Sequence, residues 1–207
     1  MNTLSFKKSL FALAIALVVV SCGEGSINNG QYETVMKKKY KTISVVPQTE
    51  YSLNGQSGSG FNANKKSRIT FPFILPENTV EWYYVFSASQ QNSTDDFNLS
   101  GQLASLIDQT GTLNFGTNRL TAPHGSDVCN VFVFLDKENR RFFKKFKNFE
   151  YLVDCSRTNI KSGTVKVPGF QELTGLKGGL EMYMGIDNPK DLKGISIGIE
   201  IVAIVLE

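Results

Sequence analysis

The chain has few of the residues on which metal and redox sites depend. Among its 207 residues there are three cysteines and one histidine. Cys129 and Cys155 are too far apart in the sequence to show the close spacing of zinc ligands. No Gly-Lys-Ser/Thr pattern follows the Gly-Ser-rich residues 55–60, so no phosphate-binding loop is indicated. We therefore expect neither a metal nor a cofactor.

A strong excess of charge of one sign is also lacking. The formal net charge is +3, and two lysines among residues 1–21 supply most of it, which leaves +1 for the rest of the chain. Domains that bind nucleic acid are normally strongly basic. A nearly neutral domain therefore argues against nucleic acid as a partner.

No apolar run is long enough to cross a bilayer as a helix. Residues 10–20 form a run of eleven apolar residues, whereas a membrane-spanning helix needs about 18–20. Lys7 and Lys8 precede this run, and a positive start followed by a short apolar core is typical of an export signal. The alternative is an uncleaved N-terminal anchor in which Cys22 is an ordinary small apolar residue.

The run ends in Val19-Val20-Ser21-Cys22, a tetrapeptide that resembles the lipobox of bacterial lipoproteins. The resemblance implies that residues 1–21 are a signal peptide and that Cys22 becomes the acylated first residue of the mature protein. It also implies a lipid-anchored protein of the cell envelope, whose partner is the lipid bilayer through acylated Cys22. The next residue is Gly23 rather than Asp, which by the sorting rule of enteric bacteria favours the outer membrane.

The mature chain is predicted to consist of a tether and one domain. Residues 22–39 are expected to form the flexible tether, and the dozen residues 23–34 would span roughly 20 Å. Residues 40–207 fit a single domain that is large enough to bury a core. Fifteen Phe and seven Tyr occur in the chain together with many Val and Ile, so strands should outnumber helices.

Strand-like runs recur at short intervals through this domain. Pro47 is expected to end a first strand over residues 42–46, and Pro72 indicates that residues 68–75 form an edge strand or a bulge. Further strands are predicted over residues 80–89, 128–135, 151–156, 164–167, 180–186 and 195–206, and short helices over residues 100–107 and 137–148. Because parallel βαβ alternation is absent, we predict a mainly β fold: an antiparallel two-sheet β-sandwich, jelly-roll-like, with one or two short helices.

Two cysteines are left once Cys22 is assigned to lipid. Export permits a disulfide, and an even number of remaining cysteines favours one between Cys129 and Cys155. Such a bond would stabilise the fold by roughly 3–4 kcal/mol. The alternative is two buried free thiols.

A basic run within residues 137–148 is a candidate contact surface. Its candidate contact residues are Arg140, Arg141, Lys144 and Lys145, with phenylalanines between them. These cations could meet lipid headgroups or an acidic partner. The alternative is a surface helix whose Phe residues, Phe146 among them, pack inward while its cations stay in solvent.

Trp82 is a second candidate contact residue, as part of an aromatic platform for sugar rings. Strand alternation places Trp82 and Tyr84 on the face opposite to Tyr83, so one of the two sets is expected to belong to the core.

Catalytic and calcium patterns are weak. His124 lies near Ser126 and Asp127, but neighbours on one loop rarely face each other as a catalytic triad requires, and no Gly-x-Ser-x-Gly elbow occurs. The acids of the predicted loops do not follow calcium-loop spacing. We therefore name no catalytic residue.

The leading hypothesis is a non-enzymatic lipoprotein that binds an envelope protein or a surface ligand. One alternative is an envelope glycan or peptide hydrolase that uses paired carboxylates, since such acids leave no short motif. A second alternative is a carbohydrate-binding surface lipoprotein.

Overall fold

The computed structural model describes residues 38–57, 66–90, 97–108, 111–113, 120–168, 179 and 181–207. Residues 37–207 group into one compact unit. The predicted signal peptide, Cys22 and the predicted tether up to residue 37 lie outside the described residues.

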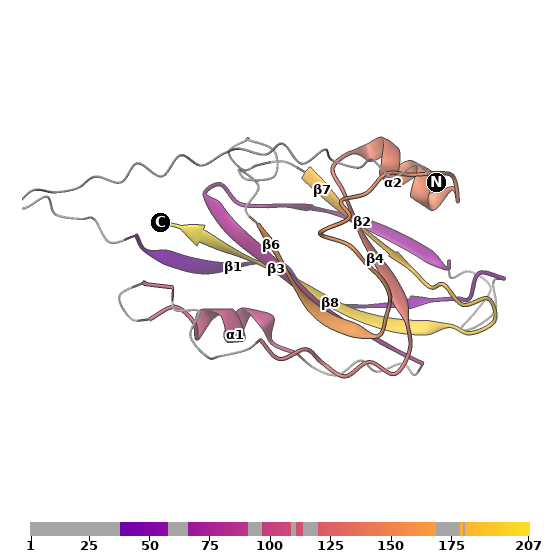
Figure 1. Cartoon of the computed structure of the whole chain (residues 1–207), viewed down its shortest axis with the longest axis horizontal. Helices are drawn as coiled ribbons and strands as arrows, with labels where there is room; N and C mark the ends of the chain where they lie inside the picture. Colours follow the sequence, from indigo (N-terminus) through magenta and orange to yellow (C-terminus); the bar gives the residue numbers. More distant parts are fainter. Residues whose placement is uncertain are drawn as a thin grey trace, which may run out of the picture. The chain divides into compact units, whose positions relative to one another are not determined.

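The described residues form two antiparallel four-stranded sheets (Figure 1). One sheet has the order β1 (Tyr40–Leu53), β8 (Ile195–Leu206), β3 (Thr79–Ser89) and β6 (Ser162–Pro168). The other has the order β2 (Arg68–Ile74), β7 (Glu181–Asp187), β4 (Cys129–Phe134) and β5 (Arg157–Ile160). The predicted mainly β sandwich is thereby confirmed.

The strand pairing is that of a jelly roll. β1 pairs with β8, β2 with β7, β3 with β6, and β4 with β5. The chain therefore pairs as one long hairpin whose two arms are wrapped into two sheets, the arrangement of a double Greek key. This wrapping brings the first and last strands together and places the connection between β4 and β5, residues 135–156, at the other end of the pairing.

The main core lies between the two sheets. Alternate residues of β3, among them Trp82, Tyr84 and Phe86, point into it. Ile195, Ile197, Ile199 and Ile201 of β8 do the same, as their alternation predicted.

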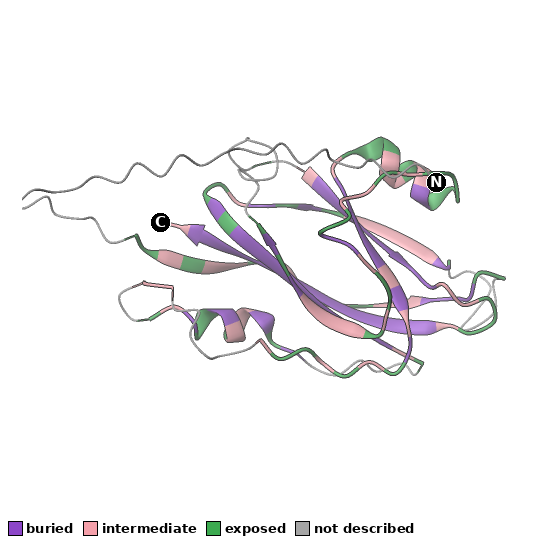
Figure 2. Cartoon of the chain, in the orientation of Figure 1, coloured by how far each residue is buried: buried purple, intermediate pink, exposed green. Residues whose placement is uncertain are grey.

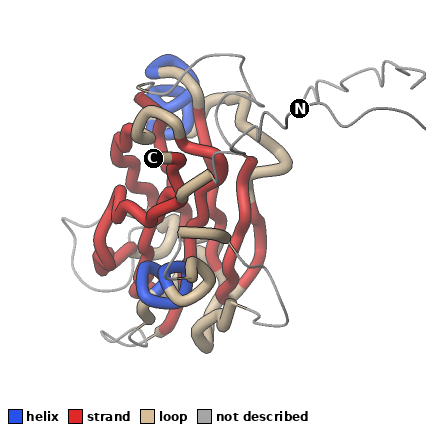
Figure 3. Tube along the Cα trace, turned by 90° about the vertical axis from the view of Figure 1, so that its left-hand side faces the viewer, coloured by secondary structure: helices blue, strands red, loops and turns tan. Residues whose placement is uncertain are grey.

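Two short helices cover the outer faces of the sheets (Figures 2 and 3). α1 (Leu99–Ala104) packs on the face of the first sheet formed by Tyr83 and Val85 of β3 and by Val202 and Ile204 of β8. α2 (Lys137–Lys144) places Phe143 on Phe132, Phe134 and Tyr183 of the second sheet. Because α1 covers the outer face of the first sheet, β3 and β8 are buried on both faces along most of their length, and Figure 2 shows this for β8.

Some predicted boundaries require correction. β1 continues through Pro47, because register shifts between Ser44 and Val46 and between Val46 and Thr49 absorb the missing ladder donor. Residues 151–156 are not a strand but a turn, in which Cys155 N–H donates to the carbonyl of Leu152. Pro72 lies in β2, an edge strand as predicted.

Candidate functional site

Trp82 is not a surface residue. Its exposed fraction is 0% and its ring packs against Phe73 and Tyr84 between the sheets. Tyr83, on the opposite face of β3, is covered by α1. The prediction of Trp82 as a ligand contact is therefore wrong, because both faces of β3 are buried and neither offers a ring to a sugar.

Cys129 and Cys155 are both buried free thiols, so the predicted disulfide is corrected. Cys129 lies opposite Ile160 at the start of β4, whereas Ser156, next to Cys155, accepts a hydrogen bond from the amide of Val133. Cys155 therefore lies near Val133, which is four positions along the strand from Cys129, or roughly 13 Å at about 3.3 Å per residue. A disulfide requires Cα atoms within about 7 Å.

His124 lies exposed on its loop, and its carbonyl accepts a hydrogen bond from the hydroxyl of Ser87. The neighbouring Asp127 is buried and forms an ion pair with Lys190. Burial raises the pKa of Asp127, but hydrogen bonds from Lys190 and from the Val128 amide outweigh burial and hold the pKa below its ordinary value. Asp127 therefore acts as an ionised support between two loops.

The buried acids Glu200 and Glu81 are also engaged by hydrogen bonds within the fold. Glu200 accepts hydrogen bonds from the amides of Leu99 and Ser100, at 2.8 and 3.1 Å, and so holds the start of α1 on β8. Glu81 accepts a hydrogen bond from the Tyr83 hydroxyl at 2.8 Å and pairs with Lys166. Within the described ranges, no three His, Cys, Asp or Glu side chains are grouped so that they could hold a metal ion.

The basic run forms α2, and its start is well capped. The side chain of Asp136 accepts a hydrogen bond from the amide of Asn139 at 2.7 Å. Arg140 does not project into solvent: its Nε donates to the hydroxyl of Thr70 at 3.0 Å, and its guanidinium carbon lies 4.9 Å from the centre of the Tyr183 ring. Arg140 therefore attaches α2 to the sheet and is only partly available to a partner.

The end of α2 has an uncommon residue in a common motif. The amide of Lys147 donates to the carbonyl of Phe142 at 3.0 Å, and the amide of Phe146 donates to the carbonyl of Phe143 at 3.2 Å. These two bonds define a Schellman motif, in which the residue in the left-handed conformation is usually glycine. Here it is Phe146, with φ of 56°, and a side chain there costs roughly 1–2 kcal/mol.

Phe146 is 59% exposed, so the prediction that it packs inward is wrong. It stacks on Arg68 of β2, whose guanidinium carbon lies 4.1 Å from the centre of the Phe146 ring and 4.8 Å from that of Phe143. The helix ends before Phe146, and the left-handed turn leaves this residue exposed beside Arg68.

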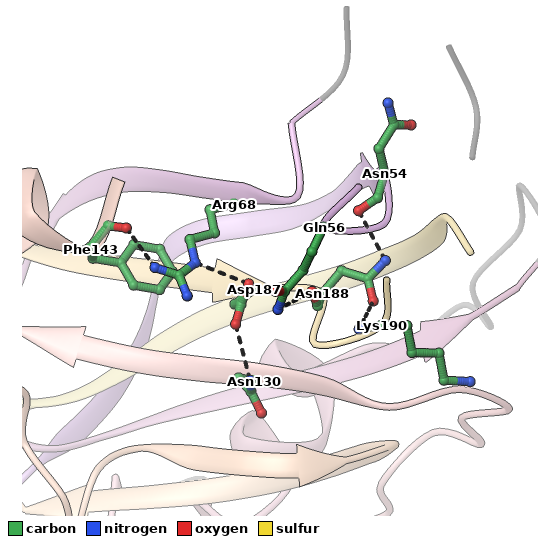
Figure 4. A network of polar contacts seen from close by, with 8 residues as sticks. All are labelled: Asn54, Gln56, Arg68, Asn130, Phe143, Asp187, Asn188 and Lys190. Carbon is green, nitrogen blue, oxygen red and sulfur yellow. Dashed lines mark hydrogen bonds and ion pairs between the residues drawn. The ribbon is translucent and has the colours of Figure 1, made fainter. Parts of the chain in front are cut away.

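Arg68 is held by a network that Figure 4 shows from close by. Its Nη1 donates to the carbonyl of Phe143 at 2.9 Å, and its Nε pairs with Asp187 of β7 at 3.1 Å. The side chain of Asn130 donates to the second oxygen of Asp187 at 3.2 Å. The side-chain amide of the next residue, Asn188, donates to the carbonyl of Asn54, which ties the turn after β1 to the turn after β7 (Figure 4).

The surface at the end of α2 is cationic. Arg141, Lys144, Lys145 and Lys147 are exposed, as is Phe146 among them in the sequence, and we call these five residues the α2 patch. Arg141 pairs with Glu138 at 3.5 Å. Among the ion pairs of the described residues, none involves Lys144, Lys145 or Lys147.

Sequence reasoning missed Arg68 and the role of Phe146. The contact of Arg68 with the Phe143 carbonyl joins residues 75 positions apart, and no local pattern predicts it. A signal for Phe146 did exist: a helix stop that lacks glycine indicates a side chain in the left-handed position.

None of the helices in the described part of the chain has the length and apolar character needed to cross a membrane. Comparison of the chain with protein-family models gave no match, and comparison with curated proteins also gave none.

Proposed function

We propose that this protein is a lipid-anchored component of a bacterial cell envelope, held at the outer membrane through acylated Cys22. Its jelly-roll domain has a non-enzymatic binding or structural role toward a negatively charged envelope protein or surface ligand. The lipobox at residues 19–22 supports the anchor. The α2 patch supports the binding role and is the observation that carries it.

The α2 patch suits an anionic partner. Three of its four cations take part in none of the ion pairs found in the described part of the chain, so their charge is available to attract a partner. The patch also rests on a rigid base, because Arg68 below it is fixed by Asp187 and by the carbonyl of Phe143. An acyl anchor would add to the effect by keeping the domain at a high effective concentration near its partner.

The alternative functions receive less support. A hydrolase with paired carboxylates needs acids that are free to act on a substrate. The buried acids Glu81, Asp127, Asp187 and Glu200 are each engaged by hydrogen bonds or an ion pair within the fold. The burial of Trp82 and Tyr84 gives no support to a sugar platform on β3.

Two variants in the native host test the two halves of the proposal. Cys22→Ala should abolish acyl labelling and release the protein from membranes, because no lipid then holds it. The triple variant Lys144→Glu, Lys145→Glu, Lys147→Glu should stay acylated but lose the anionic component that co-purifies with the wild type. Metabolic labelling with a fatty acid, membrane fractionation and affinity purification measure these outcomes.

Each variant has a matched control. Ser21→Gly keeps a small residue before the cysteine and should remain labelled. Lys66→Glu, Lys161→Glu, Lys193→Glu changes the net charge by the same amount on exposed residues outside α2 and should keep the co-purifying component. Continued acyl labelling of Cys22→Ala would refute the anchor, and equal losses in the two triple variants would refute the role of the patch.

A further inference from the structure

The α2 patch combines charge with a single exposed ring. Phe146 is 59% exposed, and the exposed cations Arg141, Lys144, Lys145 and Lys147 are its neighbours in the sequence. Among the described residues, the other large apolar side chains that are exposed belong to other segments: Ile74, Val80, Val153 and Leu192. A protein-binding surface of ordinary size has an apolar core built from several side chains. One ring among cations is instead the composition of segments that lie in a bilayer interface, where aromatic rings enter the headgroup region and basic residues meet phosphates.

The backbone presents this ring outward at a cost to the fold. Phe146 occupies the left-handed position of a Schellman motif, where glycine has no steric penalty. The residue gains little from burial, since more than half of it is exposed, and its ring lies against the guanidinium of Arg68. Arg68 is itself held by Asp187 and by the Phe143 carbonyl. The ring is therefore displayed on a fixed support.

We infer that the α2 patch binds an anionic phospholipid surface, with the Phe146 ring inserted at headgroup level and the four cations against lipid phosphates. This inference rests on the proposed function and names the anionic partner of that same patch. The acyl anchor and the patch would then act as two membrane signals, and a weak protein–lipid contact suffices once the chain is tethered. The domain would be held against the bilayer in one orientation.

The test uses residues 23–207 without Cys22, so that acylation contributes nothing. The three core clusters and the residues packed against them lie within residues 40–205, so this chain keeps every core contact that the structure describes. Co-sedimentation is measured with vesicles of equimolar phosphatidylglycerol and phosphatidylcholine, and with vesicles of phosphatidylcholine alone. We expect binding to the anionic vesicles only, and weaker binding as salt is raised.

Three variants separate the contributions. Lys144→Gln, Lys145→Gln, Lys147→Gln should lower the partition coefficient about 100-fold, since each cation near an anionic surface contributes roughly five-fold. Lys66→Gln, Lys161→Gln, Lys193→Gln removes the same charge elsewhere and should lower it no more than about three-fold. Phe146→Gly should weaken binding roughly five-fold through lost apolar contact, while the melting temperature stays within about 4 °C because relief of the left-handed strain offsets the lost stacking on Arg68.

Equal binding to neutral vesicles, or equal effects of the two lysine triples, would overturn the inference. So would a Phe146→Gly protein that binds like the wild type. If the patch captured an acidic envelope protein in the native host while the vesicles stayed unbound, the lipid assignment would be wrong and the proposed function would stand. Loss of acyl labelling from the wild type would remove the anchor without changing any vesicle result.

Discussion

Arg68 performs three tasks with one guanidinium group. It accepts two aromatic rings on its faces, it neutralises Asp187, and it satisfies a carbonyl at the end of α2. The side chains of the pair are only 16% and 6% exposed, so solvent screens their attraction weakly. Removal of either partner would leave the other as a buried charge without its ion pair. A lysine could not replace this planar group, because it has no flat face and no forked set of donors.

We predict that Arg68→Ala destabilises the fold by about 3 kcal/mol, because the buried carboxylate of Asp187 loses its cation and, among the described side chains, keeps the hydrogen bond from the Asn130 amide. Urea unfolding followed by circular dichroism measures the loss. The matched variant is Arg141→Ala, whose ion pair with Glu138 is exposed on both sides and should contribute less than about 1 kcal/mol. Similar losses in the two variants would contradict the structural role of Arg68.

At the scale of elements, the packing of α2 depends on a glycine in β7. Gly185 lies beneath the aromatic cluster that joins α2 to the second sheet. A Cβ at this position would lie 2.6 Å from Cε2 of Phe134 and 3.0 Å from Cε1 of Phe143. Such distances are too short for carbon atoms, so the two rings can pack on the sheet only because this residue has no side chain.

We predict that Gly185→Ala displaces the rings of Phe134 and Phe143 and costs about 1–3 kcal/mol. Urea unfolding gives the change in stability, and near-ultraviolet circular dichroism reports the altered aromatic packing. The control is Gly163→Ala in β6, where the nearest atom, Cε1 of Phe86, lies at an ordinary 3.6 Å. A Gly185→Ala protein with unchanged stability and an unchanged aromatic spectrum would show that α2 adapts freely.

At the scale of the whole molecule, the sandwich buries groups that ionise in alkali. Burial, with help from Asp127 and Asp187, raises the pKa of the Cys129 thiol from 9.0 to about 12. Burial also raises the pKa of the Cys155 thiol to about 11. The hydroxyls of Tyr83 and Tyr84 have pKa values raised in the same direction, again chiefly by burial. All four groups therefore keep their protons in the folded state at a pH at which the unfolded chain has lost them.

We predict that the free energy of unfolding falls as the pH rises from about 9 to about 12. In that window the unfolded chain binds fewer protons than the folded one, so each rise in pH favours unfolding. Below pH 9.0, the ordinary value for cysteine, this contribution is fully present. Urea midpoints measured across the window should decline, and the double variant Cys129→Ala, Cys155→Ala should decline less steeply. An equal slope in the double variant would show that the thiols are not the groups responsible.

The alternation of apolar residues and the composition of the sequence were enough to predict most of the strands. β3 and β8 were found because their apolar residues alternate, and Pro72 indicated an edge because proline cannot donate to a ladder. The jelly-roll-like sandwich was also predictable, since it is the arrangement that closes many short antiparallel strands around one core. The lipobox prediction depends on residues 19–22 alone and is independent of the fold.

Only the tertiary structure decided which surfaces are free. Alternation could not show that α1 covers the second face of β3, which buries Tyr83 as well as Trp82. The number of cysteines could not show that Cys129 lies at the start of β4 while Cys155 lies near Val133, toward the other end of that strand. Phe146 is exposed because α2 ends just before it, and Arg68 of β2 holds that helix end in place. Local sequence specifies strands and helix starts because those depend on neighbours in the chain, whereas burial and the α2 patch depend on residues that only the folded sheets bring together.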